Sequence, residues 1–530
     1  METSIINWII SSLPIILLIV LLAIFRWSVI KAAGLTLIIT LLTTYFYFKG
    51  SPLLIFTEAL KGGWNALTII AVVFPAILIY EIVHKGNCIN AINQVLEELS
   101  PNELFKIMAI GWIFAGFLQG ITGFGVPVAI CVPLLVAMGV KAKWAVIISL
   151  LGQAWGNTFG TLAIAWEVIV EISGITGGEL LSTAIWATLF LWSLNLLSGL
   201  AICWFYGKWK GIYKGLPIIL IISLVQGGGQ MLLSQYNQSI AAFIPSTVAL
   251  IAIVIISKLP VYRTKWEIEN SKIMDKDMKS KKTTGKEKRS KTIIAFSPYL
   301  ILVAVTILLL VIKPINQFLG QWSFGFAFPA TTTGYVIVNP SVDKYSPIKP
   351  FVDSSAVLFI TCIFSYILLR KNKLLEKNSY KELLDKTLEK VLPSTVSIIE
   401  LLIISKWMSG SGQTLLIAEG ITTAFGIYYT LMASTLGLIG SFITGSNMSS
   451  NILFVDVQMN ASGALGIGHS TLLGAQTTGG AIGSIISPSK IILGTTSAGI
   501  NGKEGEVLRE LLPFAIISTI IVGILCWIII

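Results

Sequence analysis

Charged side chains are scarce in this sequence. Lysine, arginine, aspartate and glutamate make up 12% of its 530 residues, about half the fraction usual in a soluble globular protein. Histidine occurs only twice, and the sequence shows no His/Asp/Ser arrangement and no metal-ligand spacing. A membrane-embedded enzyme is therefore disfavoured, and we expect neither a metal nor any other cofactor.

The five cysteines do not form a C-x-x-C pair. Four of them (Cys131, Cys203, Cys362 and Cys526) lie in apolar stretches, and Cys88 lies in a loop, so neither a disulfide framework nor a metal site is indicated. The start of the sequence, METSIINWIISSLPIILLIV, lacks a basic region before its apolar run. We expect an uncleaved first span there, not a removable signal peptide.

Apolar side chains are abundant, at 55% of the sequence. Apolar runs of about 20 residues, the length that crosses a bilayer as a helix, recur from end to end. The sequence predicts an all-α polytopic membrane protein with about twelve transmembrane helices and two re-entrant hairpins. The hairpins are expected near 104–138 and 427–465, where two shorter apolar segments meet at a glycine-rich or serine-rich break. We expect a single span over 143–166 and an outer loop over 314–352.

The net charge of +11 comes from basic residues between the apolar segments, so it does not indicate nucleic-acid binding. Residues 258–292 carry twelve Lys and Arg against five acids, and cytoplasmic loops are enriched in basic residues. We expect a cytoplasmic linker there, between transmembrane halves 1–257 and 293–530. It is either a solvated connector or a segment that binds anionic lipid or a partner. Counting spans from this linker puts both termini outside.

Two stretches are unusually polar for their expected depth in the membrane. GFLQGITGFG begins at Gly116, and GSFITGSNMSSNILF covers 440–454; about thirty residues after each comes a helix rich in Gln, Thr and Gly. Non-helical backbone at this depth is tolerated only against protein or a watery cavity. The candidate binding residues of these stretches are Gln119, Gly120, Thr122, Gly123, Gly125, Gln153, Asn157, Thr158, Thr444, Gly445, Ser446, Asn447, Ser449, Ser450, Asn451, Gln476, Thr477 and Thr478.

The two polar breaks are expected to enter the membrane from opposite faces, as in transporters built from inverted repeats. A helix that starts at mid-membrane offers unpaired N–H groups and a positive dipole end, which suit a small carboxylate. The competing interpretation is a kinked span whose small residues pack helices, with Gln and Thr bonding between helices.

These motifs resemble the lactate permease family. FLQGITGFGVPVAI at 117–130 is similar to that family's first hairpin, while the stretch at 442–454 and QTTGGAIGSIISP at 476–488 are similar to its second. GINGKEGEVLRELL at 499–512 resembles its closing loop and last helix. The resemblance extends over nearly the whole chain. It implies transport of L-lactate or a related 2-hydroxy monocarboxylate such as glycolate, usually with protons.

Five positions depart from that family's pattern. Gln119 and Asn447 stand where the family usually has Glu and Asp, and Gln153 with Ala154 stands where it has Asn-Thr. Lys490 stands where the family tends to have a neutral residue. Because carboxylates are the usual proton carriers of a symporter, proton coupling is either lost here or located elsewhere.

Asp456 and Lys490 are the candidate coupling or charge residues. Asp456 lies nine residues beyond Asn447 and is the candidate substitute proton carrier. Lys490 is either an anion-attracting charge or a residue that snorkels to the cytoplasmic surface.

The sequence therefore predicts a plasma-membrane secondary transporter for a small 2-hydroxy monocarboxylate, operating by proton symport and alternating access. Its expected partners are the small organic anion, protons and the lipid bilayer. The alternative is a carrier or uniporter for another small organic anion, without proton coupling. No oligomeric state is indicated.

Overall fold

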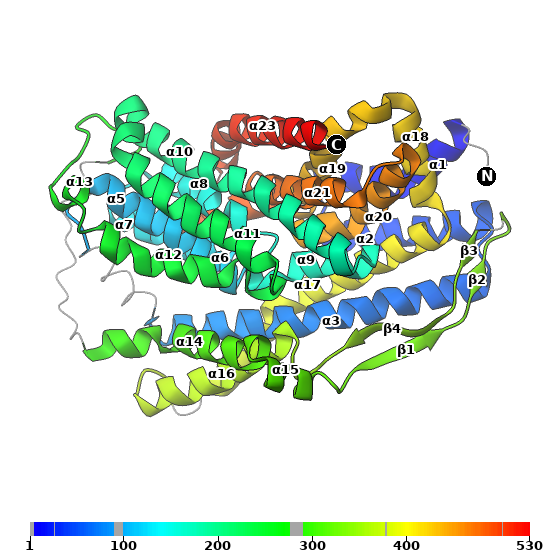
Figure 1. Cartoon of the computed structure of the whole chain (residues 1–530), viewed down its shortest axis with the longest axis horizontal. Helices are drawn as coiled ribbons and strands as arrows, with labels where there is room; N and C mark the ends of the chain where they lie inside the picture. The colour runs from blue at the N-terminus through cyan, green and yellow to red at the C-terminus, as the bar shows by residue number, and fades with distance from the viewer. Residues whose placement is uncertain are drawn as a thin grey trace.

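The computed structural model of the chain is mostly helical. It describes residues 5–25, 27–88, 99–123, 125–275, 290–335, 337–376, 379–500 and 502–530. Most helices run along the longest axis in Figure 1. In that view α14, α15, α16, β1 and β4 lie on one side of the long helix α3, and most other helices lie on the other side. The polytopic α-helical class predicted from the sequence is what the structure shows.

The first half of the chain consists of helices and helical turns. Their bounds are α1 (Ile5–Ala23), α2 (Val29–Leu42), η1 (Thr43–Tyr47), α3 (Pro52–Lys85), α5 (Glu103–Met108), η2 (Ala109–Phe114), α6 (Ala115–Ile121), α7 (Val126–Ala137), α8 (Ala142–Gln153), η3 (Ala154–Gly156), α9 (Gly160–Ser173), α10 (Gly177–Ser223), η4 (Leu224–Gly228), α11 (Gly229–Ser234), η5 (Gln238–Ile240), α12 (Phe243–Ile256) and α13 (Pro260–Arg263).

The second half is helical apart from two short strand pairs. Its helices are α14 (Ser290–Thr306), η7 (Ile307–Val311), α15 (Lys313–Leu319), α16 (Ser354–Lys371), α17 (Ser379–Gly410), α18 (Gln413–Phe425), η8 (Gly426–Tyr428), α19 (Tyr429–Thr444), α20 (Asn447–Leu465), α21 (His469–Ile485), α22 (Pro488–Ser497) and α23 (Glu504–Ile529). In both halves, the predicted breaks coincide with short turns between helices, α6 to α7 and α19 to α20.

Eight helical segments among the described residues are long and apolar enough to cross a membrane, or nine if the bent pair at 294–319 counts as one span. Several other helices are short. With 12, 14 and 10 residues, α8, α9 and α22 fall below the about 20 residues of a full span. The total of twelve spans and two hairpins stays a prediction.

The helix α10 is two antiparallel segments, not one rod. Its backbone leaves the helical region at Gly207 and Lys208. A Cβ on Gly211 would lie 2.2 Å from the Cys203 carbonyl oxygen, and a Cβ on Gly215 would lie 2.3 Å from the Cys203 Sγ. Eight or more residues along a straight helix cover about 12 Å, so these contacts require the chain to reverse direction.

The stretch 143–166, expected to form one span, is interrupted near its middle. The helix α8 ends at Gln153, the tight turn η3 follows, and α9 begins at Gly160. The reason is local composition, because the two glycines of the AWGNTFG segment, Gly156 and Gly160, both pack directly against Gln119 of α6. This single-span prediction is therefore wrong, and the interruption brings polar residues into the interior.

The segment 314–352, expected to be an outer loop, contains the strands. The strand β1 (Phe324–Phe328) pairs antiparallel with β4 (Val342–Ile348), with Phe326 opposite Tyr345, and β2 (Thr331–Thr332) pairs with β3 (Val338–Asn339). The prediction of purely α-helical structure missed these two ribbons. They lie along α3 in Figure 1.

The basic linker 258–292 falls into two parts. Residues 276–289 lie outside the described residues, so the linker prediction is not addressed there. The part before them packs against the turn between α7 and α8, where the Lys141 N–H donates to the Ile273 carbonyl at 2.8 Å and the Asp275 N–H donates to the Gly139 carbonyl at 2.7 Å. Residues 273–275 are therefore held against the helices, and the solvated connector stays a prediction for the rest of the linker.

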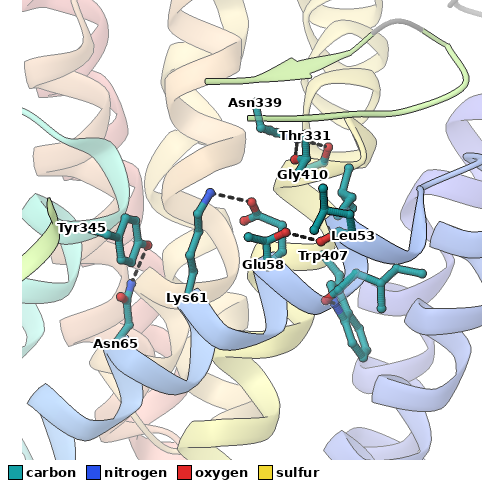
Figure 2. A network of polar contacts seen from close by, with 12 residues as sticks. Leu53, Glu58, Lys61, Asn65, Thr331, Asn339, Tyr345, Trp407 and Gly410 are labelled. Carbon is teal, nitrogen blue, oxygen red and sulfur yellow. Dashed lines mark hydrogen bonds and ion pairs between the residues drawn. The ribbon is translucent and has the colours of Figure 1, made fainter. Parts of the chain in front are cut away.

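A buried ion pair lies where α3 meets α17 and the strands (Figure 2). The Lys61 Nζ lies 2.7 Å from a Glu58 carboxylate oxygen, and both side chains are more than nine-tenths buried. The Lys61 ammonium also lies over the rings of Phe328 and Tyr345. The pair therefore compensates two charges that have both been removed from water.

Replacing Glu58 with glutamine is expected to lower the free energy of unfolding by about 3 kcal/mol, because it leaves a buried lysine without a counter-ion. The loss is measured as a fall in the thermal transition of the purified protein, followed by tryptophan fluorescence. The matched control is Glu382→Gln, which removes an exposed partner of Lys386 and is expected to have a much smaller effect. Equal effects of the two variants would contradict this account.

Candidate functional site

The turn between α6 and α7 is closed by glycines in the left-handed region. Gly123 has φ +54° and Gly125 has φ +84°, a backbone that side chains other than glycine rarely adopt. A Cβ on Gly123 would lie 2.2 Å from the Thr161 hydroxyl of α9. The Thr122 hydroxyl donates to the Leu118 carbonyl at 3.0 Å. This turn is therefore pressed against α9, with its polar side chain used to end α6.

The turn between α19 and α20 is built in a similar way. Gly445 ends α19 with φ +79°, and a Cβ there would lie 2.2 Å from the Ser489 hydroxyl of α22. The Ser446 hydroxyl caps α20 by accepting from the Ser449 N–H at 3.3 Å. A Cβ on Gly125 of the first turn would lie 2.5 Å from Leu493, also on α22. The short helix α22 therefore touches both turns.

The start of α20, the middle of α21 and the interruption between α8 and α9 meet in one group of hydrogen bonds. The Asn447 amide donates to the Thr158 hydroxyl at 3.1 Å and the Thr477 hydroxyl at 3.3 Å. The two hydroxyls lie 3.0 Å apart. The Asn451 amide donates to the Thr477 hydroxyl at 3.1 Å and to the Ala165 carbonyl at 3.0 Å. We call Thr158, Asn447, Asn451 and Thr477 the polar cluster.

A second set of contacts joins the same interruption to α22. The Asn157 amide donates to the Ser484 hydroxyl at 2.9 Å, and the Lys490 Nζ lies 3.4 Å from the Asn157 amide oxygen. Lys490 is only 9% exposed. Since Asn157 and Thr158 are neighbours in the chain, a buried cation lies beside the polar cluster.

Several buried polar atoms on the elements that meet here have no hydrogen-bond partner among the described residues. They are the Gln119 Oε1, both amide atoms of Gln153, the Asn447 Oδ1 and the Asn451 Oδ1. Buried polar groups are almost always satisfied in folded proteins, so unsatisfied ones require an explanation, such as a ligand or water. Carbonyl oxygens accept from a hydroxyl group, and the Gln153 amide nitrogen donates to a carboxylate.

The backbone at the start of α9 is strained. Thr161, Leu162 and Ala163 have φ of +51°, +52° and +68°, and each left-handed non-glycine residue costs about 1–2 kcal/mol. Such outliers cluster at functional sites, where the surrounding structure holds them. Thr161 contacts the first turn, and Leu162 lines a cavity on the other side of α9.

Some predicted residues lie away from the polar cluster. Gly120 packs against Phe243 and Ser246 of α12, so its lack of a side chain serves helix packing. The Thr478 hydroxyl donates to the Gly474 carbonyl of its own helix. Asp456 faces α17, where it interacts with Lys406 and Ser409; its position as substitute proton carrier beside Asn447 is therefore not supported by its contacts.

Other predicted residues hold the second turn together. The Thr444 hydroxyl donates to the Gly440 carbonyl at 2.8 Å. The Ser450 hydroxyl donates to the Gly437 carbonyl at 2.8 Å and lies 3.3 Å from the Gln476 amide. The Gln476 amide oxygen accepts from Gln458 at 3.0 Å. These side chains fix α19, α20 and α21 to one another and are already satisfied.

Sequence reasoning did not single out Ser484, Ser489 or Thr161. Ser484 lies within the motif QTTGGAIGSIISP that carries the resemblance, but no sequence pattern indicates that it pairs with Asn157. The contacts of Ser489 and Thr161 depend on where α22 and α9 pack. No sequence spacing indicates them.

A cavity of about 420 Å³ lies on the opposite side of α9. Its lining includes the carboxylates of Glu167, Glu171 and Asp353. Burial raises the pKa of Asp353, which precedes α16, to about 6. Among the described residues, no group of three or more His, Cys, Asp or Glu side chains is arranged to hold a metal ion.

The comparisons with known proteins cover nearly the whole chain. The family model described as L-lactate permease matches residues 7–530. This chain belongs to the L-lactate permease family. It is 26% identical to the L-lactate permease of Halalkalibacterium halodurans, over 96% of this chain and 93% of that protein. It is 25% identical to the glycolate permease GlcA of Escherichia coli K12, over 97% of this chain and 94% of that protein.

Among solved structures, the chain is similar to the YdaH transporter of Alcanivorax borkumensis, with a TM-score of 0.46 and 12% identity. The match covers 89% of this chain and 87% of that chain. Family membership and the apolar helices together make this a multi-pass membrane protein of a permease family.

The hydroxyl of Thr477 is expected to be important for stability. Thr477→Val keeps the shape but removes a group that contacts three members of the polar cluster, leaving buried amide donors with fewer partners. We expect a loss of about 2 kcal/mol, typical of unsatisfied buried polar groups. Thermal unfolding of the purified protein measures the loss.

Thr478→Val is the matched control, because the neighbouring hydroxyl bonds only within its own helix. Its effect on the thermal transition is expected to be well under half that of Thr477→Val. If the control is the more destabilising variant, the polar cluster does not hold α20 and α21 together.

Proposed function

We propose that this protein is a secondary transporter that carries L-lactate or a related small 2-hydroxy monocarboxylate, such as glycolate, across the plasma membrane. The transported anion binds between the two turns, at the polar cluster, and proton symport with alternating access moves it. Relatives named as L-lactate and glycolate permeases support this substrate class.

The observation that carries the proposal is the meeting of both halves of the chain at one buried polar centre. Thr158 and Asn157 come from the first half, whereas Asn447, Thr477 and Lys490 come from the second. A site between two structural halves allows each half to move relative to the other around a fixed ligand. The unsatisfied amide groups at this centre suit an anion with one hydroxyl group.

The proposed architecture has two inverted halves, 1–257 and 293–530, joined by a cytoplasmic linker. It has about twelve full spans, two re-entrant hairpins near 104–138 and 427–465, and both termini outside. The matching left-handed glycines in the two turns support the repeat. The segment Glu103–Ile121 is almost entirely buried inside the protein. This burial supports a hairpin arm that is surrounded by other helices.

The alternative is a carrier or uniporter for another small organic anion that moves without protons. It is favoured by Gln119 and Asn447, which are neutral at the two positions where the resemblance implies acids. The two functions differ in their response to a pH gradient.

Counterflow of labelled L-lactate into proteoliposomes tests the proposal. We expect saturable exchange that unlabelled glycolate inhibits, because the site recognises both the carboxylate and the neighbouring hydroxyl. Acetate, which lacks the hydroxyl, is expected to compete more weakly. The absence of saturable exchange would contradict the proposed substrate class.

The variant Gln119→Glu/Asn447→Asp separates symport from the alternative. The native protein is expected to accumulate lactate when an inward proton gradient is imposed. If native uptake ignores the gradient while the double variant follows it, the native protein is not a proton symporter. Gln119→Asn/Asn447→Gln serves as the matched neutral control at the same positions.

A further inference from the structure

Lys490 is a buried cation that has no acidic partner among the described residues. Its ammonium donates to the Asn157 amide oxygen at 3.4 Å, and no salt bridge of the described residues includes it. Two other buried lysines are different: Lys61 pairs with Glu58, and Lys406 interacts with Asp456. An ammonium removed from water without a counter-ion is costly.

The elements packed against α22 do not supply the missing charge. Besides the two turns and the interruption before α9, these elements are α7, α8, α21 and α23. Their ionisable side chains are engaged elsewhere or are thiols: Lys143 pairs with Glu506 and Glu510, Glu504 accepts from Thr495, and His469 bonds Ser462. The remaining ionisable groups on these elements are Cys131, Arg509 and Cys526. In the part of the chain that the structure describes, none of these hydrogen-bonds or pairs with Lys490.

The N-terminus of α22 adds to the positive electrostatic potential around Lys490. Ser487 precedes the helix without a side-chain cap, so the first N–H groups are not satisfied in that way. The positive end of the helix dipole lies in this first turn, which contains Lys490. Asn157, the contact of Lys490, neighbours Thr158 of the polar cluster, where the Asn447 Oδ1 is buried without a partner.

We propose that the Lys490 ammonium binds the carboxylate of the transported anion and that the same amine carries the coupled proton. This inference rests on the proposed function and assigns to one residue the tasks expected of the two missing hairpin acids.

The charge balance of such a cycle is complete. On one side of the membrane the neutral amine takes up a proton and the resulting ammonium pairs with the carboxylate, so the loaded site carries no net charge. On the other side the carboxylate leaves and the ammonium returns its proton to water. The empty site then goes back with a neutral amine. One proton and one carboxylate move together.

The contacts of α22 connect the proposed anion site at Lys490 to both turns. Ser489 and Leu493, on either side of Lys490 in the helix, pack directly on Gly445 and Gly125 of the two turns. We therefore expect a shift of α22 upon anion binding to move both turns, because its side chains contact the turns at glycines.

Lys490→Arg and Lys490→Met test the proposal in proteoliposomes. Arginine stays protonated because its pKa is above about 12, so a loaded site still forms but an empty site cannot return neutral. We expect Lys490→Arg to retain lactate counterflow within about tenfold of native, the effect of a modest binding change. Its uptake is expected to no longer respond to an inward proton gradient.

Lys490→Met removes the charge. The apparent affinity in counterflow is expected to fall about 10- to 100-fold, as for loss of a charge-assisted hydrogen bond. Lys143→Arg and Lys143→Met are the matched controls, because Lys143 lies on α8 but pairs with acids of α23; both are expected to behave like native. Size-exclusion profiles and melting curves check that each variant is folded.

Gradient-driven uptake that persists in Lys490→Arg, or counterflow that is unchanged in Lys490→Met, overturns the proposal. So does loss of the gradient response in Glu167→Gln or Glu171→Gln while Lys490→Arg keeps it, because the cavity would then carry the proton.

A native protein that exchanges pyruvate or acetate but not lactate contradicts the proposed function alone, and the Lys490 variants are then compared with that anion. Native protein that exchanges none of these carboxylates contradicts both.

Discussion

The hydrogen bonds from the Asn447 and Asn451 amides to the hydroxyls of Thr477 and Thr158 are the interaction on which this structure depends. They join two helices of the second half to the interrupted helix of the first half, and all four side chains are buried. The glycines in the turns, the caps on α19 and α20 and the strained start of α9 all serve to bring these side chains together.

The sequence predicted the positions of both turns and most polar side chains, because glycine and serine at membrane depth are rare and specific signals. It predicted neither that α8 stops at Gln153 nor that three left-handed residues begin α9, since both depend on close packing around Gln119. The contact of Lys490 with Asn157 joins residues more than 300 positions apart, and no local pattern encodes it. The strands at 324–348 were missed because proline and glycine there also fit a loop.

The ionisable groups near the polar cluster differ from those that the family resemblance implies. The polar cluster has no ionisable side chain, whereas Glu167, Glu171 and Asp353 line a separate cavity on the far side of α9. The cation beside the cluster is Lys490, which has no acidic partner among the described residues, unlike Lys61 and Lys406. In the proposed cycle a bound carboxylate completes that pairing and makes the occupied site neutral.

This neutrality of the occupied site is the central claim, and charge movement tests it most directly. Proteoliposomes on a solid-supported membrane are given a step in L-lactate concentration, with equal pH on both sides, while current and internal pH are followed. The account predicts internal acidification without sustained current, since each anion travels with one proton. A sustained current carried by lactate, without acidification, would contradict it.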